Sequence, residues 1–339
     1  LSSAVTLLAT LLGVPLGVLF GKTDLPFRAG FAVLLSVPLL IPSYVIAVAW
    51  FGVLGEGGWI SALVPQAPKA LSSMLFGLAG CIGVLLTTFV PIVILLTMTY
   101  LGAINPRLEQ AGRLADSWPA VLRRITLPLL APAILLAAAL VFLLTFGELG
   151  VPTYLRFPVY PVETLTQFAA FYDFSAATAA AMPLLAVTIG ILVLEHRLFR
   201  KRALELRSET VGSVPMQISL GRWRTPTLVA VLAWGALTVV LPLAVLLASS
   251  WSLNAYVEAF DRAGASILRS LGFAVVGATL LTLLGFFLGY LVHQRRPPLW
   301  RGDAACPSAA GHRDHRHASD SSSRVFQGVR QPLHRDDFH

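Results

Sequence analysis

Charged residues are scarce in this sequence. Asp, Glu, Lys and Arg make up 12% of its 339 residues, whereas 56% are hydrophobic, and the mean hydropathy is +0.76. A soluble domain carries about 25% charged residues, because it must cover its surface with groups that water solvates. The composition therefore excludes an ordinary soluble protein and predicts an integral membrane protein.

Cysteine is almost absent. The chain has two cysteines, Cys81 within an apolar run and Cys306 near the C-terminus. From this pair we expect neither a disulfide framework nor a thiolate metal site.

Acidic residues are outnumbered by basic ones. The 25 Lys and Arg against 17 Asp and Glu give a net charge of +8, which in a soluble chain would suggest a nucleic-acid partner. Here the basic residues fall in short loops between apolar runs, where membrane topology accounts for them. We therefore expect membrane lipid, and no nucleic acid, around this chain.

Long apolar runs are abundant. A helix of about 20 residues crosses the roughly 30 Å of hydrocarbon in a bilayer. The sequence predicts an all-α polytopic membrane protein with about seven transmembrane helices. The runs cover residues 1–21, 29–54, 73–101, 128–147, 175–195, 226–248 and 270–293.

The loops between these runs differ in charge. Sixteen Lys and Arg fall in loops 22–28, 102–127, 196–225 and 294–301, against four in the alternate loops. Because basic residues are retained on the cytoplasmic side, the pattern puts residue 1 outside and loop 102–127 in the cytoplasm. The expected location is a bacterial plasma (inner) membrane.

A short segment of the chain is repeated. The letters TLLG at residues 10–13, followed by LG at 16–17, recur at residues 282–285 and 288–289. Both copies contain GxxxG, a pattern that lets two helix backbones approach closely. The longer match predicts a partial tandem duplication.

The duplication predicts four parts of the chain. We expect a first half that lacks its first helix, a cytoplasmic linker, the start of a second half, and a polar tail. Their bounds are residues 1–200, 201–225, 226–301 and 302–339.

The tail differs in composition from the rest of the chain. It is rich in His and Ser. A shift of reading frame across Ser308–Arg316 would restore an apolar sequence in the style of residues 37–47, and this is the interpretation we favour. A genuine disordered tail and a His-based metal site are the alternatives.

Residues 17–23, GVLFGKT, imitate a phosphate-binding loop. A P-loop needs four residues between its glycines and follows a strand, whereas this segment has three and ends an apolar helix. We therefore interpret Lys22 as a basic helix exit, and we expect neither a nucleotide site nor another cofactor in this chain.

Asn105–Pro128 is the one long polar segment between apolar runs. Asn105 and Pro106 are typical of a helix start, because Asn caps the free N–H groups and Pro has none to cap. Ser117, Trp118 and Pro119 predict the start of a second short helix. The segment is thus expected to be a helix-turn-helix outside the hydrocarbon.

This segment resembles the cytoplasmic loop of membrane subunits of ATP-driven importers, which has the pattern E-A-A-x3-G-x9-I-x-L-P. The spacing from Glu109 to Pro128 is intact, while Gln110 replaces an alanine and Ala115 replaces the glycine. The loss of that glycine puts the exact loop geometry in doubt. The residues carried over to the loop are Glu109, Gln110, Ala111, Ala115, Asp116, Ile125, Leu127 and Pro128.

The resemblance implies a permease of the ABC importer family. In that family the loop forms a coupling helix that docks on a separate ATP-hydrolysing subunit, so Glu109, Ala111 and Ala115 would lie at or near the contact. FGELGVPTYL and YPVETLTQFAAFYDF resemble the fused iron(III) importer permeases, which implies two halves in one chain, here incomplete at both ends. It also implies two cytoplasmic ATP-binding subunits, an extracytoplasmic substrate-binding protein and no enzymatic activity of the chain itself. Iron(III) is the expected cargo, with thiamine, polyamine and phosphonate open.

Two other classes of function are weighed against this one. An ion-coupled carrier or channel would need ionisable residues in the middle of its spans, and we find none convincing. A membrane-bound metal enzyme would need the tail histidines as ligands.

Pathway residues are only weakly indicated. Pro42 interrupts the second span, and Glu148 lies at the outer end of the fourth. A proline frees carbonyl groups that face protein or a water-filled cavity, but a structural kink and a carboxylate at the membrane interface are the plainer alternatives.

Overall fold

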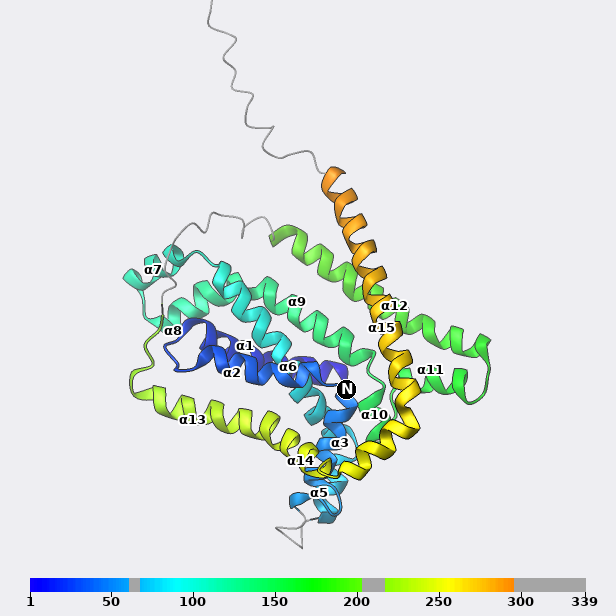
Figure 1. Ribbon diagram of the computed structural model, residues 1–339. Coiled ribbons are helices and arrows are strands. Elements are labelled where there is room, and N and C mark those ends of the chain that lie inside the picture. The colour runs from blue at the N-terminus through cyan, green and yellow to red at the C-terminus, as the bar shows by residue number, and fades with distance from the viewer. Residues whose placement is uncertain (61–67, 203–216, 296–339) are drawn as a thin grey trace, which may run out of the picture. The chain divides into compact units, whose positions relative to one another are not determined.

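A computed structural model describes residues 1–60, 68–202 and 217–295 (Figure 1). It is all-helical apart from one isolated bridge, and six helices are long and apolar enough to cross a membrane, or seven with a bent pair counted as one span. This confirms the all-α, multi-span prediction. The chain forms two compact units, Leu1–Ser252 and Leu253–His339.

Three helices form the centre of the first unit. They are α1 (Ser2–Lys22), α6 (Leu78–Ala103) and α9 (Leu127–Phe146), and each packs on the other two. A Cβ added to Gly13 would lie 2.6 Å from Val93 Cβ, and one added to Gly17 would lie 2.6 Å from Thr97 Cβ. No larger residue fits there, so the first GxxxG does let two helices approach closely, as predicted.

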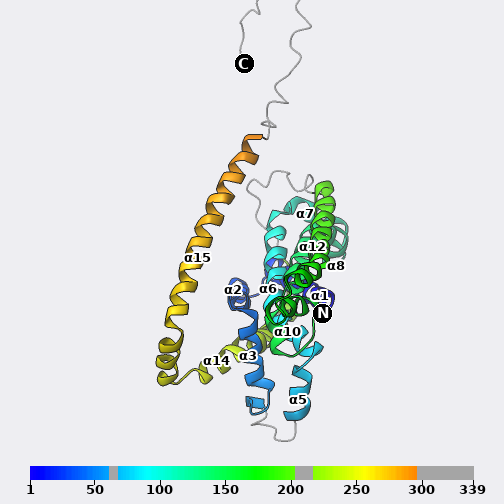
Figure 2. The ribbon, with the colours of Figure 1, turned by 90° about the vertical axis from the view of Figure 1, so that its right-hand side faces the viewer.

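The second span is broken. The helix α2 (Arg28–Ser36) and the 3₁₀ turn η1 (Val37–Leu40) are followed, at an angle of 101°, by α3 (Ser43–Leu54). Pro42, in an extended conformation with φ −52° and ψ 133°, is the residue before α3. Because proline has no N–H to donate, it ends one helix and starts the next. Figure 2 shows α3 running on toward α5 (Pro68–Leu75), on which it packs.

The polar segment contains one separate helix and not two. This helix is α7 (Pro106–Ala115). The predicted second short helix, α8 (Trp118–Val121), continues through a π-helical turn, η2 (Leu122–Thr126), into α9. The predicted start of a second helix at Trp118 is therefore confirmed, but its separation from the next span is wrong, because Trp118–Phe146 is one apolar stretch of 29 residues.

The region after α9 is helical as well. α10 (Gly150–Tyr154) packs on α3 and α6, and α11 (Tyr160–Ala169) packs on α12 (Phe174–Arg202), which also contacts α9. The aromatic and proline-rich segment 149–174 thus contains the helix α11.

The first unit extends past residue 226. The 3₁₀ turn η4 (Gly221–Trp223), α13 (Arg224–Gly235), the π-helical η5 (Ala236–Val240) and α14 (Leu241–Ser249) form one span. This span packs on α2 and α3. The first compact unit therefore runs to Ser252, and the predicted division into two halves at residue 226 stays a prediction.

Residues 217–220 return to the end of α1. The amide of Ile218 donates a hydrogen bond to the Lys22 carbonyl at 2.7 Å, and the amide of Asp24 donates one to the Ile218 carbonyl at 3.2 Å. The amide of Leu220 donates to Asp24 Oδ1 at 2.9 Å. This pairing holds the chain beside the C-terminus of α1.

The described part of the second unit is a single helix, α15 (Leu253–Arg295). At 1.5 Å per residue its 43 residues span about 64 Å, roughly twice the hydrocarbon thickness. The predicted span 270–293 lies within it. A Cβ on Gly285 or Gly289 would meet no atom within 4 Å among the described residues. The predicted tail, 302–339, lies outside the described residues.

Candidate docking loop

The start of α7 follows the predicted chemistry. Asn105 Oδ1 accepts a hydrogen bond from the amide of Arg107 at 3.0 Å, and Pro106 is the first helical residue. The helix ends at Asp116, whose backbone is extended with φ −149° and ψ 170°. These two ends define a rigid helix of ten residues.

A close contact folds α7 against the turn that follows it. A Cβ added to Gly112 would lie 2.5 Å from Ile125 Cδ1 and 3.3 Å from Val121 Cγ2. Gly112, which our pattern treated as an unspecified position, is therefore the point of closest approach between α7 and the end of the Ile125 side chain. Ala115 is exposed at the last turn of the helix, where an alanine is favourable. Its replacement of the expected glycine thus leaves the loop intact. Ile125 packs α7 against the turn η2.

Asp116 holds the turn together. Its Oδ2 accepts from Arg124 Nη1 at 3.0 Å, and its Oδ1 accepts from the amide of Ser117 at 2.8 Å. Its carbonyl accepts from Arg113 Nη1 at 2.9 Å, and the Arg113 guanidinium lies 5.0 Å from the Trp118 ring centre. The side chain and the carbonyl of Asp116 are thus occupied by hydrogen bonds within the loop.

Glu109 is not on the surface. Its side chain is 0% exposed, and its Oε2 accepts a hydrogen bond from Lys22 Nζ, 4% exposed, at 2.7 Å. Its Oε1 accepts from Thr126 Oγ1 at 3.0 Å. Both oxygens of the Glu109 carboxylate are thus bound within the chain, and the place of Glu109 at or near a contact with a partner stays a prediction. Lys22 is likewise a buried partner and not an open helix exit.

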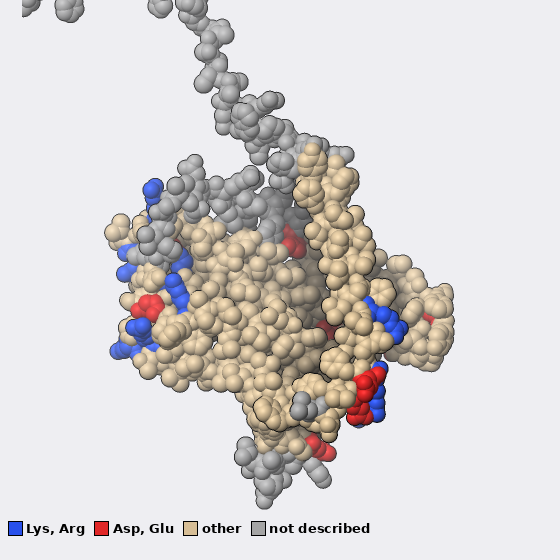
Figure 3. Space-filling view, viewed as in Figure 1, with Lys and Arg blue, Asp and Glu red and all other residues tan. Residues whose placement is uncertain are grey.

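The outward face of α7 carries the other side chains. Leu114 is 93% exposed, and the exposed residues beside it are Arg107, Leu108, Gln110, Ala111 and Ala115. Leu127 and Pro128 are exposed at the start of α9. Figure 3 shows Lys and Arg gathered at this end of the first unit, while the body beside it is largely uncharged. The loop thus presents a leucine among small and basic residues.

Glu148 has a structural partner on its own segment. Its Oε1 accepts hydrogen bonds from the amides of Gly150 at 3.0 Å and Val151 at 3.3 Å. These are N–H groups at the start of α10, which a carboxylate stabilises. Glu148 and the exposed Pro42 therefore have local roles in helix starts, and a pathway role for either stays a prediction.

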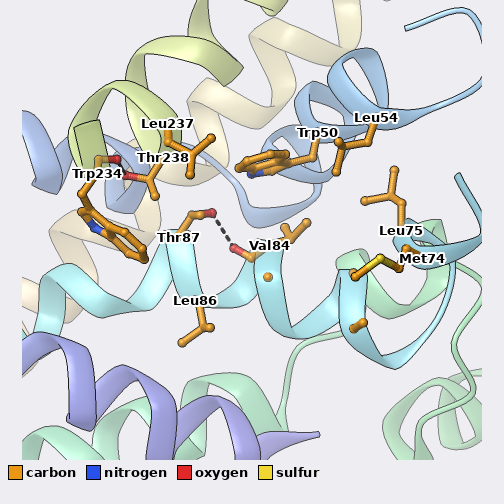
Figure 4. A pocket seen from close by; sticks show the side chains of 13 residues that line it. Trp50, Leu54, Met74, Leu75, Val84, Leu86, Thr87, Trp234, Leu237 and Thr238 are labelled. Atoms are coloured by element: carbon orange, nitrogen blue, oxygen red, sulfur yellow. Dashed lines mark hydrogen bonds between the residues drawn. The ribbon is translucent and has the colours of Figure 1, made fainter. Parts of the chain in front are cut away.

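A cavity of about 310 Å³ lies between α3, α5, α6 and the α13–η5 segment. Trp50, Leu54, Met74 and Trp234 are among its walls (Figure 4), and none of the described residues that line it is charged. The Thr87 hydroxyl donates to the Val84 carbonyl at 2.7 Å, within its own helix. The cavity thus offers no cluster of polar groups for a charged cargo. Across the described ranges, no group of three or more His, Cys, Asp or Glu could hold a metal ion.

The chain is similar in sequence to known transport permeases. No family model matches the chain. It is 29% identical over 199 residues to a probable molybdenum ABC transporter permease of Haloferax volcanii, covering 57% of this chain and 70% of that one. It is 25% identical over 196 residues to the molybdate/tungstate transport system permease WtpB of Thermococcus kodakarensis, covering 57% and 72%.

Among solved structures, the inward-facing MetNI methionine ABC transporter resembles the chain with a TM-score of 0.46 at 18% identity, covering 59% of this chain and 92% of that one. The sequence similarities support the coarser prediction, that the chain is a multi-span protein of the ABC-transporter permease family. They give no support to iron(III) or to fused halves.

Three residues that hold the loop in place were not assigned to it from the sequence: Lys22 at the end of α1, and Gly112 and Thr126 within the loop. Lys22 ends an apolar helix, where a basic residue is ordinary. Its partner lies 87 positions away, a separation that local patterns do not span. Gly112 could have been found from its helical spacing of three from Glu109, which puts both on one face.

Proposed function

We propose that the chain is a permease subunit of an ATP-driven importer, and that the outward face of α7 docks on a cytoplasmic ATP-binding subunit. The observation that carries the proposal is the exposure of Leu114 on a helix whose acidic residue is turned inward. An apolar anchor within a polar rim is the usual arrangement of an interface hot spot. The similarity to ABC-transporter permeases supports the same assignment.

The composition of this face suits a protein partner. Ala111 and Ala115 are small, so a second surface can approach the α7 backbone closely. Arg107, Arg123 and Arg124 are exposed around them, which favours a partner with acidic groups. The excess of basic residues in loop 102–127 supports a cytoplasmic position for α7, the side on which ATP is available.

The cargo we propose is an oxyanion of the molybdate or tungstate type. The support is that the two relatives are named for molybdenum and for molybdate/tungstate. Iron(III), which the resemblance of residues 146–155 and 160–174 implied, is the competing cargo, together with an arrangement of two fused halves. In either case an extracytoplasmic binding protein would deliver the cargo.

The docking proposal is tested with the full chain in proteoliposomes and its cognate ATP-binding subunit. We expect the permease to stimulate ATP hydrolysis by that subunit, and Leu114→Asp to raise the half-saturating concentration of the subunit about tenfold or more, as loss of a hot spot does. Arg262→Met, an exposed change in α15, is the control and should leave it unaltered. Equal affinity of the wild type and Leu114→Asp would refute docking through this face.

The cargo proposal needs a second measurement. Uptake of radioactive molybdate that requires both ATP and the binding protein would support it. Uptake of iron(III) but not of molybdate would show that iron(III) is the cargo and would contradict the proposal of an oxyanion. ATP-independent uptake driven by an ion gradient would favour the ion-coupled carrier and contradict the importer.

A further inference from the structure

A buried ion pair joins the loop to the transmembrane helices. Lys22 is the last residue of α1, Glu109 lies in the first turn of α7, and Thr126 lies just before α9. The Glu109 carboxylate binds both of the others, at 2.7 Å and 3.0 Å. One side chain of α7 thus contacts two of the three central helical segments.

The surroundings make this connection firm. Lys22 and Glu109 are 4% and 0% exposed, so water does not screen the attraction between their charges as it would at the surface. The Lys22 carbonyl is also held by the amide of Ile218 at 2.7 Å. The lysine is therefore fixed at its backbone as well as at its ammonium group.

The far end of the connection is rigid too. Along α1, a Cβ on Gly17 would lie 2.6 Å from Thr97 Cβ, and one on Gly21 would lie 2.9 Å from Leu101 Cδ1. α1 and α6 are thus in backbone-to-side-chain contact up to the turn that carries Lys22. A displacement of this end of α1 must be shared by α6, because there is no free space between them.

We propose that Lys22 and Thr126 are positioning residues that transmit the movement of α7 to the transmembrane helices through Glu109. The inference rests on the proposed docking of an ATP-binding subunit on α7. The two faces of the loop then have different functions. The outward face binds the subunit, and the inward Glu109 carboxylate transmits the resulting movement of α7 to the transmembrane helices. Removing the pair should then impair transmission and leave binding unchanged.

The experiment separates these two quantities. The ATP-binding subunit is titrated against the full chain in proteoliposomes, and two numbers are read: the half-saturating concentration and the maximal stimulation of ATP hydrolysis. For Lys22→Met we expect a half-saturating concentration within about twofold of wild type and a maximal stimulation about tenfold lower, a usual size for coupling between sites. Leu114→Asp should change the first number instead.

Further variants guard against misfolding. Lys22→Met leaves a buried carboxylate unpaired, which destabilises a protein. The double variant Lys22→Met with Glu109→Gln removes both charges and should fold as the wild type does, yet still show the reduced maximal stimulation. Thr126→Val removes one hydrogen bond at nearly constant volume and should reduce the maximal stimulation about two- to fivefold. Glu258→Gln, in an exposed ion pair of α15, is the matched control and should change neither number.

The outcomes distinguish the two proposals. If the double variant stimulates ATP hydrolysis to within about twofold of wild type, the ion pair transmits nothing and the inference is overturned, while docking stands if Leu114→Asp weakens binding. If Leu114→Asp binds as tightly as wild type, the docking proposal fails and the inference fails with it. A lower maximal stimulation at unchanged affinity in both Lys22 variants supports the inference.

Discussion

The two faces of α7 differ in every respect that matters to the function. The inward face holds Glu109, which is fully buried and doubly bound, and Gly112, against which the end of the Ile125 side chain packs. The outward face holds Leu114, 93% exposed, between small residues. The difference teaches that the acidic residue of such a loop can belong to the chain's own core, while an apolar residue is the most exposed one on the opposite face.

The largest effect of a substitution on either face of α7 is expected at Glu109. Glu109→Ala leaves the Lys22 ammonium group buried without a partner, so we expect a loss of about 3–5 kcal/mol in the free energy of unfolding. The measurement is denaturant unfolding of the purified chain in detergent. The double variant with Lys22→Met should recover most of the loss, and a Glu109→Ala chain as stable as wild type would mean that the pair is not buried in the protein.

Gly112 should be the next most sensitive position. Gly112→Leu forces a side chain against Ile125, whose Cδ1 lies 2.5 Å from the Cβ position, and overpacking of this kind costs about 1–3 kcal/mol. The thermal unfolding temperature in detergent should fall. Ala111→Leu, on the exposed face, is the matched control, and an equal fall in both variants would contradict the distinction between the faces.

A substitution of Leu114 should affect binding of the ATP-binding subunit and not the stability of the chain. Leu114→Asp replaces an exposed side chain, so the unfolding free energy should stay within about 0.5 kcal/mol of wild type. Co-purification with the ATP-binding subunit should nevertheless be lost. Leu108→Asp, half-exposed on the neighbouring turn, should weaken it less, and an unfolded Leu114→Asp chain would show that the residue is part of the core.

The smallest effect is expected at Asp116. Its ion pair with Arg124 is exposed on both sides, and surface pairs contribute about 0–1 kcal/mol. Asp116→Ala removes this pair and the exposed hydrogen bond from the Ser117 amide, so it should lower the unfolding free energy by about 1 kcal/mol, and high salt should reduce the ion-pair part of the difference. A loss as large as that of Glu109→Ala would equate an exposed ion pair with a buried one.

Much of the architecture was predictable because hydrophobicity and helix signals are local. The apolar runs became the spans, Asn105 caps α7 as expected, and the first GxxxG packs on α6. The second span shows the limit: Pro38 and Pro42 predict an interruption, but the bend of 101° depends on the packing of α3 on α14 and α5. Likewise, α8 is joined to α9 through the π-helical turn η2, and Pro128 lies inside the continuous stretch Trp118–Phe146 instead of ending a helix.

The site was predictable only in part. The polar composition and the resemblance to an importer loop located the segment, but the direction of each side chain was not accessible from the sequence. A glutamate in a polar segment is expected to face water, whereas Glu109 is turned inward by a lysine that lies far away in the sequence. Gly112 was overlooked because the pattern directed attention to position 115. Tertiary packing determines which distant residues pair and which face of a helix is buried, and local sequence patterns carry no information about it.

The account depends most on the claim that the outward face of α7 is where an ATP-binding subunit docks. The direct measurement is the rate at which a water-soluble maleimide modifies Leu114→Cys in proteoliposomes, in a chain whose two native cysteines are replaced. The account predicts rapid modification of the free permease and a rate at least tenfold lower with saturating ATP-binding subunit, because a docked surface excludes the reagent. An equal rate with and without a subunit that is shown to be bound would contradict it.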